Sequence, residues 1–305
     1  MSSTSITPAF PKPPGVHLTG ATPGKACHHR TSLEPIICSS EMSAICNRGM
    51  YTSRIIKAGA LFEDTITLFT FWDITSSVQE NLDRFRSQNL FAKSSRSRVE
   101  DILAVFRRRY LSDPMTLRAL IAFVRAAFPK EYLKPILYFH TARADPLVYD
   151  VATQFLHSLY RSGRKDVIPL ELERLILQWS KEGKTTTSWS QATIRRVTQG
   201  LLATLRDFGI LEGEVKKRIS PARLPLLSFA YIAFYLRRET QSGRKILESS
   251  DWHLFFLSPR DVEQLFLEAH QHGLLEYQAA GSVIRIDFPA ASLEEYAYAL
   301  AERAH

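Results

Sequence analysis

Residues 189–236 read WSQATIRRVTQGLLATLRDFGILEGEVKKRISPARLPLLSFAYIAFYL, and the rest of the chain is best interpreted outward from this stretch. Ser190 is a typical N-cap residue, because its hydroxyl accepts an unpaired amide of a first helical turn. The apolar residues that follow recur at spacings of three and four, which predicts an amphipathic helix from Gln191 to about Phe208. Gly209 supplies the left-handed residue that ends such a helix.

The two faces of this predicted helix differ in chemistry. Its inner stripe is apolar and its outer face is basic and amide-bearing. Guanidinium and amide groups hydrogen-bond phosphates or base edges, and small alanines let a groove approach closely. The stripe consists of Ile194, Val197, Leu201, Leu205 and Phe208, and the outer face of Ala192, Arg195, Arg196, Gln199, Ala203 and Arg206.

A short basic hairpin is predicted next, because apolar or small residues alternate with polar ones from Ile210 to Ile219. Lys216, Lys217 and Arg218 lie near its middle, where they are expected to contact a phosphate backbone. A helix, a basic hairpin and an apolar helix in this order are typical of a winged-helix DNA-binding module. The alternative is an ordinary helix-loop-helix with a solvated basic loop.

Composition and charge favour a soluble protein with an acidic partner. The 305 residues suit two or three domains, and 45% hydrophobic and 23% charged residues are typical of a globular chain. The net charge of +8 is unevenly spread. Residues 190–245 carry 11 Lys and Arg against 4 Asp and Glu, whereas residues 246–305 carry 3 against 10. Only the first segment suits a polyanion such as nucleic acid.

The first 49 residues differ from the rest and are predicted to be a disordered extension or a mis-assigned start, with Met50 as the alternative start. Pro and Gly crowd this segment without any helical period. Cys27, Cys38 and Cys46 lie here beside His28 and His29, but their spacing matches no closed zinc site, so no metal is expected.

The remaining chain is predicted to be mainly α. Residues 50–182 form an all-helical domain without a sheet, residues 189–245 a basic winged-helix-like module, and residues 246–305 an acidic winged-helix-like module with a C-terminal helix. The arginine triplet Arg107, Arg108 and Arg109 ends one helix of the first domain. A structural or capping role is the main interpretation, and phosphate contact is kept as the alternative.

No catalytic or cofactor motif appears. Phosphate-cradling glycine loops, nucleophile elbows and HExxH are absent from the sequence, and the histidines are scattered. The best candidate for a membrane span, Leu224 to Leu236, is broken by Pro225 and Ser228 and is shorter than the roughly 18 apolar residues that such a span needs. The amino terminus lacks a secretion signal pattern. A cytoplasmic protein that is not an enzyme, with no cofactor and no membrane partner, is therefore expected.

The stretch MYTSRIIKAGALFEDT at residues 50–65 resembles the opening of the BrxA family of bacteriophage-exclusion (BREX) defence systems. Asn81-Leu82, Gln88-Asn89-Leu90, the run from Arg107 to Tyr110 and the run from Leu205 to Leu211 fit the same family. The resemblance covers about residue 50 onward. It implies a small non-enzymatic component of a system that blocks phage DNA replication and methylates host DNA. It also implies a helical half similar to the RNA-binding protein NusB, winged-helix-like parts and DNA binding.

Three functions follow as hypotheses. The first is a double-stranded DNA-binding accessory protein that uses mainly phosphate contacts, through Arg195, Arg196, Gln199, Arg206 and residues 216–218. The second is an assembly adaptor whose acidic module docks other BREX proteins. The third is RNA binding through the NusB-like half.

Overall fold

Short polar residues begin several of the helices. The computed structural model describes residues 49–220, 223–281 and 283–305. In it Ser77, Ser95 and Asp113 each accept a hydrogen bond from an amide of the first turn. Residues 1–48 of the predicted extension, which include its cysteines and histidines, lie outside the described residues.

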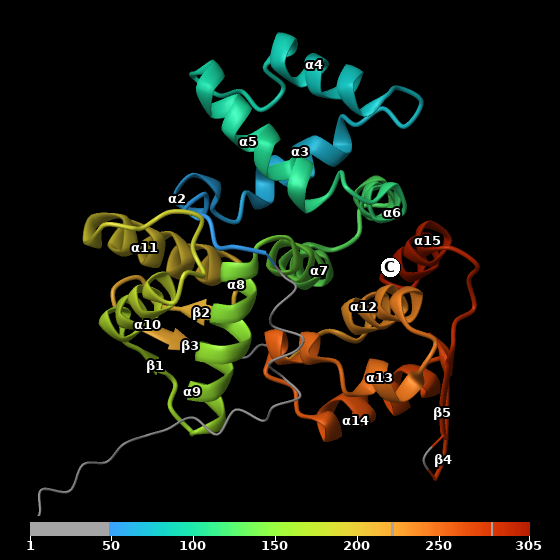
Figure 1. Ribbon diagram of the computed structural model, residues 1–305. Helices are drawn as coiled ribbons and strands as arrows, with labels where there is room; N and C mark the ends of the chain where they lie inside the picture. Colours follow the sequence, from blue (N-terminus) through green and yellow to red (C-terminus); the bar gives the residue numbers. More distant parts are fainter. Residues whose placement is uncertain (1–48, 221–222, 282) are drawn as a thin grey trace, which may run out of the picture. The chain divides into compact units, whose positions relative to one another are not determined.

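Six helices occupy residues 55–144 (Figure 1). Each buries an apolar stripe in a shared core, as the periodicity predicts. They are α2 (Ile55–Ala58), α3 (Phe62–Thr70), α4 (Val78–Gln88), α5 (Arg96–Arg109), α6 (Pro114–Arg125) and α7 (Lys130–Ala144).

A continuous helical rod follows α7 and contains a π-helical stretch. Asp145 caps α8 (Pro146–Asp150), which passes without a break into the π-helix η1 (Val151–Leu156) and then into α9 (His157–Arg161). The residues at both junctions keep right-handed helical dihedrals, so the three segments share one axis (Figure 1). This rod leads directly into the elements around the predicted basic hairpin.

A three-stranded antiparallel sheet joins parts of the chain that the sequence assigned to different domains. Its strands are β1 (Asp166–Val167), β2 (Leu211–Glu212) and β3 (Lys217–Ile219), in the order β1-β3-β2. Asp166 pairs with Arg218, and Leu211 pairs with Ile219. The expectation of no strand in residues 50–182 is therefore wrong, because β1 lies there and completes the sheet. Along the chain, β1 is followed by α10 (Pro169–Lys181) and α11 (Gln191–Asp207), and then by β2.

The C-terminal part repeats a helix and a hairpin. It contains α12 (Leu226–Glu239), α13 (Gly243–Leu247), the 3₁₀-helix η2 (Ser250–Phe255), α14 (Pro259–Gln271), β4 (Glu276–Ala280), β5 (Val283–Asp287) and α15 (Leu293–Glu302). Strands β4 and β5 form a separate two-stranded ribbon with Tyr277 opposite Ile286. Gly243 is required where α13 meets β5, because a Cβ there would lie 2.3 Å from the carbonyl oxygen of Ile284.

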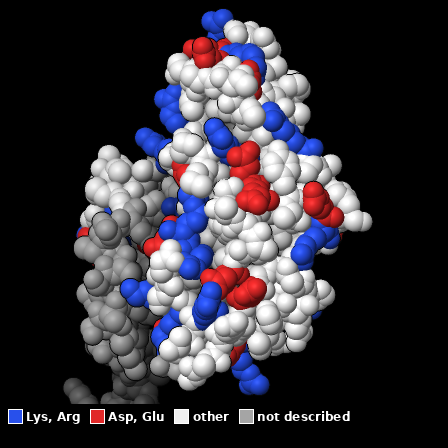
Figure 2. Space-filling model, turned by 90° about the vertical axis from the view of Figure 1, so that its right-hand side faces the viewer, with Lys and Arg blue, Asp and Glu red and all other residues white. Residues whose placement is uncertain are grey.

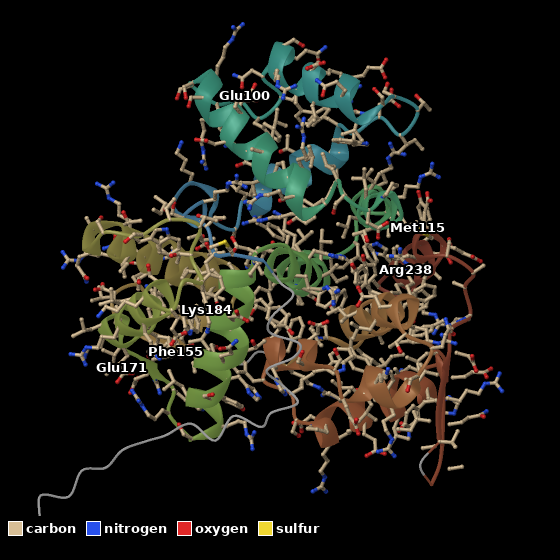
Figure 3. All side chains as sticks on the ribbon, viewed as in Figure 1. Glu100, Met115, Phe155, Glu171, Lys184 and Arg238 are labelled. Atoms are coloured by element: carbon tan, nitrogen blue, oxygen red, sulfur yellow. The ribbon has the colours of Figure 1, made fainter. Side chains whose placement is uncertain are left out.

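The C-terminal helices pack against the helices α6 and α7. The last helix, α15, packs against α6, and α12 packs against α7. Arg238 of α12 reaches Asp113 at 3.1 Å and lies beside Met115 of α6 (Figure 3). Arg143 of α7 pairs with both Glu239 and Asp251. The described residues thus share one core, and the prediction of a mainly helical protein with small antiparallel sheets is confirmed.

Candidate nucleic-acid interface

Helix α11 presents a basic face to solvent. Ser190 caps it by accepting from the amide of Thr193, and the predicted stripe of Ile194, Val197, Leu201 and Leu205 is fully buried. The opposite face carries Arg195, Arg196, Gln199 and Arg206, all exposed. Arg206 forms a surface ion pair with Asp207 at 2.9 Å, which solvent weakens. Helical geometry therefore gathers three guanidinium groups and one amide on a single outward surface.

One flank of α11 is covered by α2. Gly200 makes this approach possible, since a Cβ there would meet the carbonyl oxygen of Ile55 at 3.0 Å. Lys57 of α2 and Arg54, which precedes this helix, are exposed. Lys57 also pairs with Asp101 at 3.2 Å. The sequence pattern of α11 gave no sign that α2 packs against it, because the two helices lie far apart in the chain.

The arginine triplet at the end of α5 divides into three different environments. Arg107 is exposed, Arg108 is half-buried and Arg109 is 7% exposed. The guanidinium of Arg109 donates to the carbonyl oxygens of Gly59 at 2.9 Å and Ala60 at 3.2 Å. Burial lowers the pKa of Arg109 and also that of Arg108. Arg109 therefore holds the segment after α2, and it is removed from the candidate phosphate contacts.

The basic residues of the β2–β3 hairpin also differ. Lys216 is exposed at the tip, and Arg218 is exposed on the sheet, where it pairs with Asp166 at 3.3 Å. Lys217 is only 8% exposed, and its Nζ donates to the carbonyl oxygen of Gly213 at 2.7 Å and to that of Glu214. The expectation that Lys217 contacts phosphate is corrected, because its buried ammonium is hydrogen-bonded to the hairpin turn and stabilises it.

Strand β1 brings further cations to the hairpin that sequence reasoning missed. Arg164 and Lys165 precede β1 and line one shallow hollow together with Arg218. Arg164 is also paired with Glu171 at 3.0 Å. The sequence does show a local run of basic residues at 161–165. Only the pairing of β1 with β3 places this run beside the hairpin.

The C-terminal elements present a different charge pattern. Figure 2 shows the face formed by the elements at the right of Figure 1, and basic and acidic side chains are intermixed there. On α14, the helix that precedes the second hairpin, Glu263, Gln264 and Leu267 are exposed. This helix, which occupies the place that α11 has in the first half, also exposes Asp261 and one arginine, Arg260, so it lacks the strongly basic face of α11.

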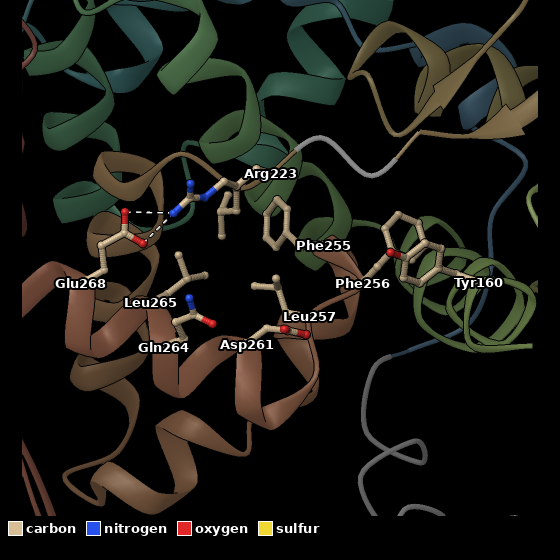
Figure 4. Close-up of a pocket in the computed structure, with 10 residues that line it drawn as sticks. Tyr160, Arg223, Phe255, Phe256, Leu257, Asp261, Gln264, Leu265 and Glu268 are labelled. Atoms are coloured by element: carbon tan, nitrogen blue, oxygen red, sulfur yellow. Dashed lines mark hydrogen bonds and ion pairs between the residues drawn. The ribbon is translucent and has the colours of Figure 1, made fainter. Parts of the chain in front are cut away.

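A groove lies between α9, η2 and α14 (Figure 4). Its wall combines aromatic and aliphatic side chains with polar ones, and the Tyr160 ring lies 5.1 Å from that of Phe256. Arg223 and Glu268 form an ion pair of 2.7 Å at its rim. The remaining lining residues are Leu224, Phe255, Leu257, Asp261, Gln264 and Leu265.

Neither metal ligands nor an activated histidine come together in the part of the chain that the structure describes. No group of three or more His, Cys, Asp or Glu side chains is placed there to hold a metal. Burial lowers the pKa of His140 to about 3 and that of His157 to about 4. His140 is hydrogen-bonded to the Tyr231 hydroxyl at 2.9 Å, and His157 stacks on His253. Across the described ranges, no helix is long and apolar enough to cross a membrane.

The fold and the candidate interface define a mainly helical protein with small antiparallel sheets and a basic surface centred on α11. The chain belongs to the BrxA family, whose family model matches residues 49–236. This match confirms the resemblance, and membership implies a component of a BREX defence system. A solved structure titled "SspB crystal structure" is similar at 14% sequence identity and a TM-score of 0.48, with 82% of this chain and 89% of that chain covered. A comparison with curated proteins gave no match.

Proposed function

We propose that the protein is a non-enzymatic, double-stranded DNA-binding component of a BREX system, and that α11 and the β2–β3 hairpin form its DNA contact. The exposed arginines of α11 carry this proposal. A helix with outward guanidinium and amide groups fits the major groove, where such groups meet phosphates and base edges.

The local topology supports a winged-helix assignment for residues 146–220. The α8–η1–α9 rod, β1, α10, α11, β2 and β3 follow in that order, and β3 lies between β1 and β2. Helix α11 then takes the place of a recognition helix, and the β2–β3 hairpin that of a wing. In this assignment the unit begins earlier than the predicted boundary at residue 189, because it includes β1 and α10.

Binding is expected to depend mainly on phosphate contacts. Arg195, Arg196, Arg206 and Lys216 are exposed cations, and Gln199 is the only uncharged polar side chain among the candidates. Neutralised phosphates release counterions, so affinity should fall steeply with salt.

The test is a fluorescence anisotropy titration of a labelled duplex. Reversing two charges with Arg195→Glu and Arg196→Glu should weaken binding by about tenfold or more at moderate salt. Arg244→Glu with Arg260→Glu makes the same charge change on the C-terminal elements and should have a smaller effect. Wild-type affinity in the α11 variant would refute the assignment. Structured RNA as competitor tests the NusB likeness of residues 50–182: it should displace DNA poorly if DNA is the ligand.

A second candidate function is supported by the acidic face of α14 and the groove beside it. We propose that this surface docks a basic, partly apolar segment of another BREX protein. Truncation of residues 246–305 cannot test this, because α15 packs against α6 and buries Leu300.

Point changes on the exposed face of α14 provide the test. Glu263→Lys with Leu267→Ser should leave DNA affinity unchanged while co-purification with co-expressed BREX proteins and phage resistance are lost. Unchanged co-purification would refute docking at this face.

A further inference from the structure

The tip of the β2–β3 hairpin exposes an apolar side chain. Val215 is 90% exposed, and among the large hydrophobic residues that the structure describes the next is Val283 at 67%. Val215 lies between the exposed residues Glu214 and Lys216. The exposed tip therefore carries no net charge, since the carboxylate offsets the ammonium. Lys216 can contact one phosphate from this tip, but the tip as a whole has no net positive charge that would attract a polyanion.

The turn that presents Val215 is held in one conformation by Gly213 and Lys217. Gly213 has a φ of +85°, and a Cβ there would lie 2.0 Å from the carbonyl oxygen of Lys216, so only glycine fits. The buried Lys217 ammonium binds the carbonyl oxygens of Gly213 and Glu214. Val215 is thus held outward by a defined backbone, and ordering it on a partner costs little entropy.

The hairpin is also placed next to the basic face. It leaves the C-terminal end of α11 at Gly209, and β2 packs against α11. Both elements lie at the left of Figure 1. A helix seated in a major groove leaves such a hairpin facing the adjoining minor groove, whose walls are deoxyribose C–H groups.

We propose that Val215 enters the minor groove of the bound duplex and packs against its sugar walls, which makes the protein favour A·T over G·C there. This inference rests on the proposed DNA binding. The discrimination arises because the guanine N2 amine projects from the floor of the minor groove, where A·T pairs have no such group. An isopropyl group offers that amine no hydrogen bond and is obstructed by it.

Base analogues that alter only the minor groove test the proposal. Short duplexes are compared in which inosine replaces guanine, removing the amine, or 2,6-diaminopurine replaces adenine, adding it. Their major-groove edges stay the same. Wild-type protein should bind the duplexes without the amine roughly fivefold more tightly, about the value of burying half a valine side chain.

Val215→Ser should abolish this preference, and Val283→Ser, the matched change at the other hairpin, should retain it. Both residues are exposed, so neither change disturbs the core. Duplex binding that is indifferent to the amine, or a full preference in Val215→Ser, would overturn the placement of Val215 alone. Failure of the wild-type protein to bind any duplex would overturn the proposed function, and this inference with it.

Discussion

Lys216 and Lys217 are neighbours of equal charge that the structure assigns to different tasks, and changing each to Met separates them. Lys216 is exposed, whereas the Lys217 ammonium donates hydrogen bonds to two carbonyl oxygens of the turn. Each phosphate contact contributes about 0.9 to the slope of log affinity against log salt. Lys216→Met should therefore reduce the magnitude of that slope by about 0.9, and Lys217→Met should leave it unchanged.

Lys217→Met should instead loosen the turn. Loss of a charged donor costs about 1–3 kcal/mol for a buried pair, and the lower end applies because Gly213 and Glu214 are exposed and water can replace the ammonium. A loss of about 1 kcal/mol accelerates hydrogen exchange of the hairpin amides by roughly fivefold. Affinity then falls equally at all salt concentrations. A slope reduced as far in Lys217→Met as in Lys216→Met would refute the distinction.

Two further predictions concern stability. Burial holds the pKa of His140 at about 3 and that of His157 at about 4, below the unfolded value near 6.5. The unfolded chain therefore binds these protons first, and the free energy of unfolding should fall by up to about 1.4 kcal/mol per pH unit and histidine as pH drops from about 6 to 4. Urea unfolding at neutral pH and near pH 5 checks this, and equal values would contradict it. Tyr51→Phe removes a buried 2.5 Å hydrogen bond to Asp150, so it should cost about 2 kcal/mol and lower the melting temperature by about 5 °C. An unchanged melting temperature would show that this bond adds nothing.

Helix positions followed from the sequence because their signals are local. Ser95, Asp113 and Ser190 mark helix starts by side-chain chemistry that acts within one turn. The buried and exposed faces of α11 also follow from its period alone. By contrast, β1 has only two residues, Asp166 and Val167, and so carries no alternation that a sequence pattern could reveal.

The roles of individual cations required the tertiary structure. Arg107 and Arg109 are indistinguishable in sequence, yet one faces solvent and the other caps carbonyl groups of a segment some 50 residues away. Lys217 points inward because the register of β3 sets the side on which it lies, and nothing local fixes that register. Helix α2 packs on α11 at Gly200, a contact between distant segments that no local pattern predicts.

The salt dependence of duplex binding tests the central claim most directly. Replacing Arg195, Arg196 and Arg206 together by Gln removes three cations from α11. The control replaces three exposed arginines of the C-terminal elements, Arg244, Arg260 and Arg285, in the same way. If α11 binds phosphates, its variant should reduce the magnitude of the slope of log affinity against log salt by roughly 2.7, and the control should change it far less. Equal slopes for wild type and the α11 variant, or equal reductions in both variants, would contradict DNA binding through α11.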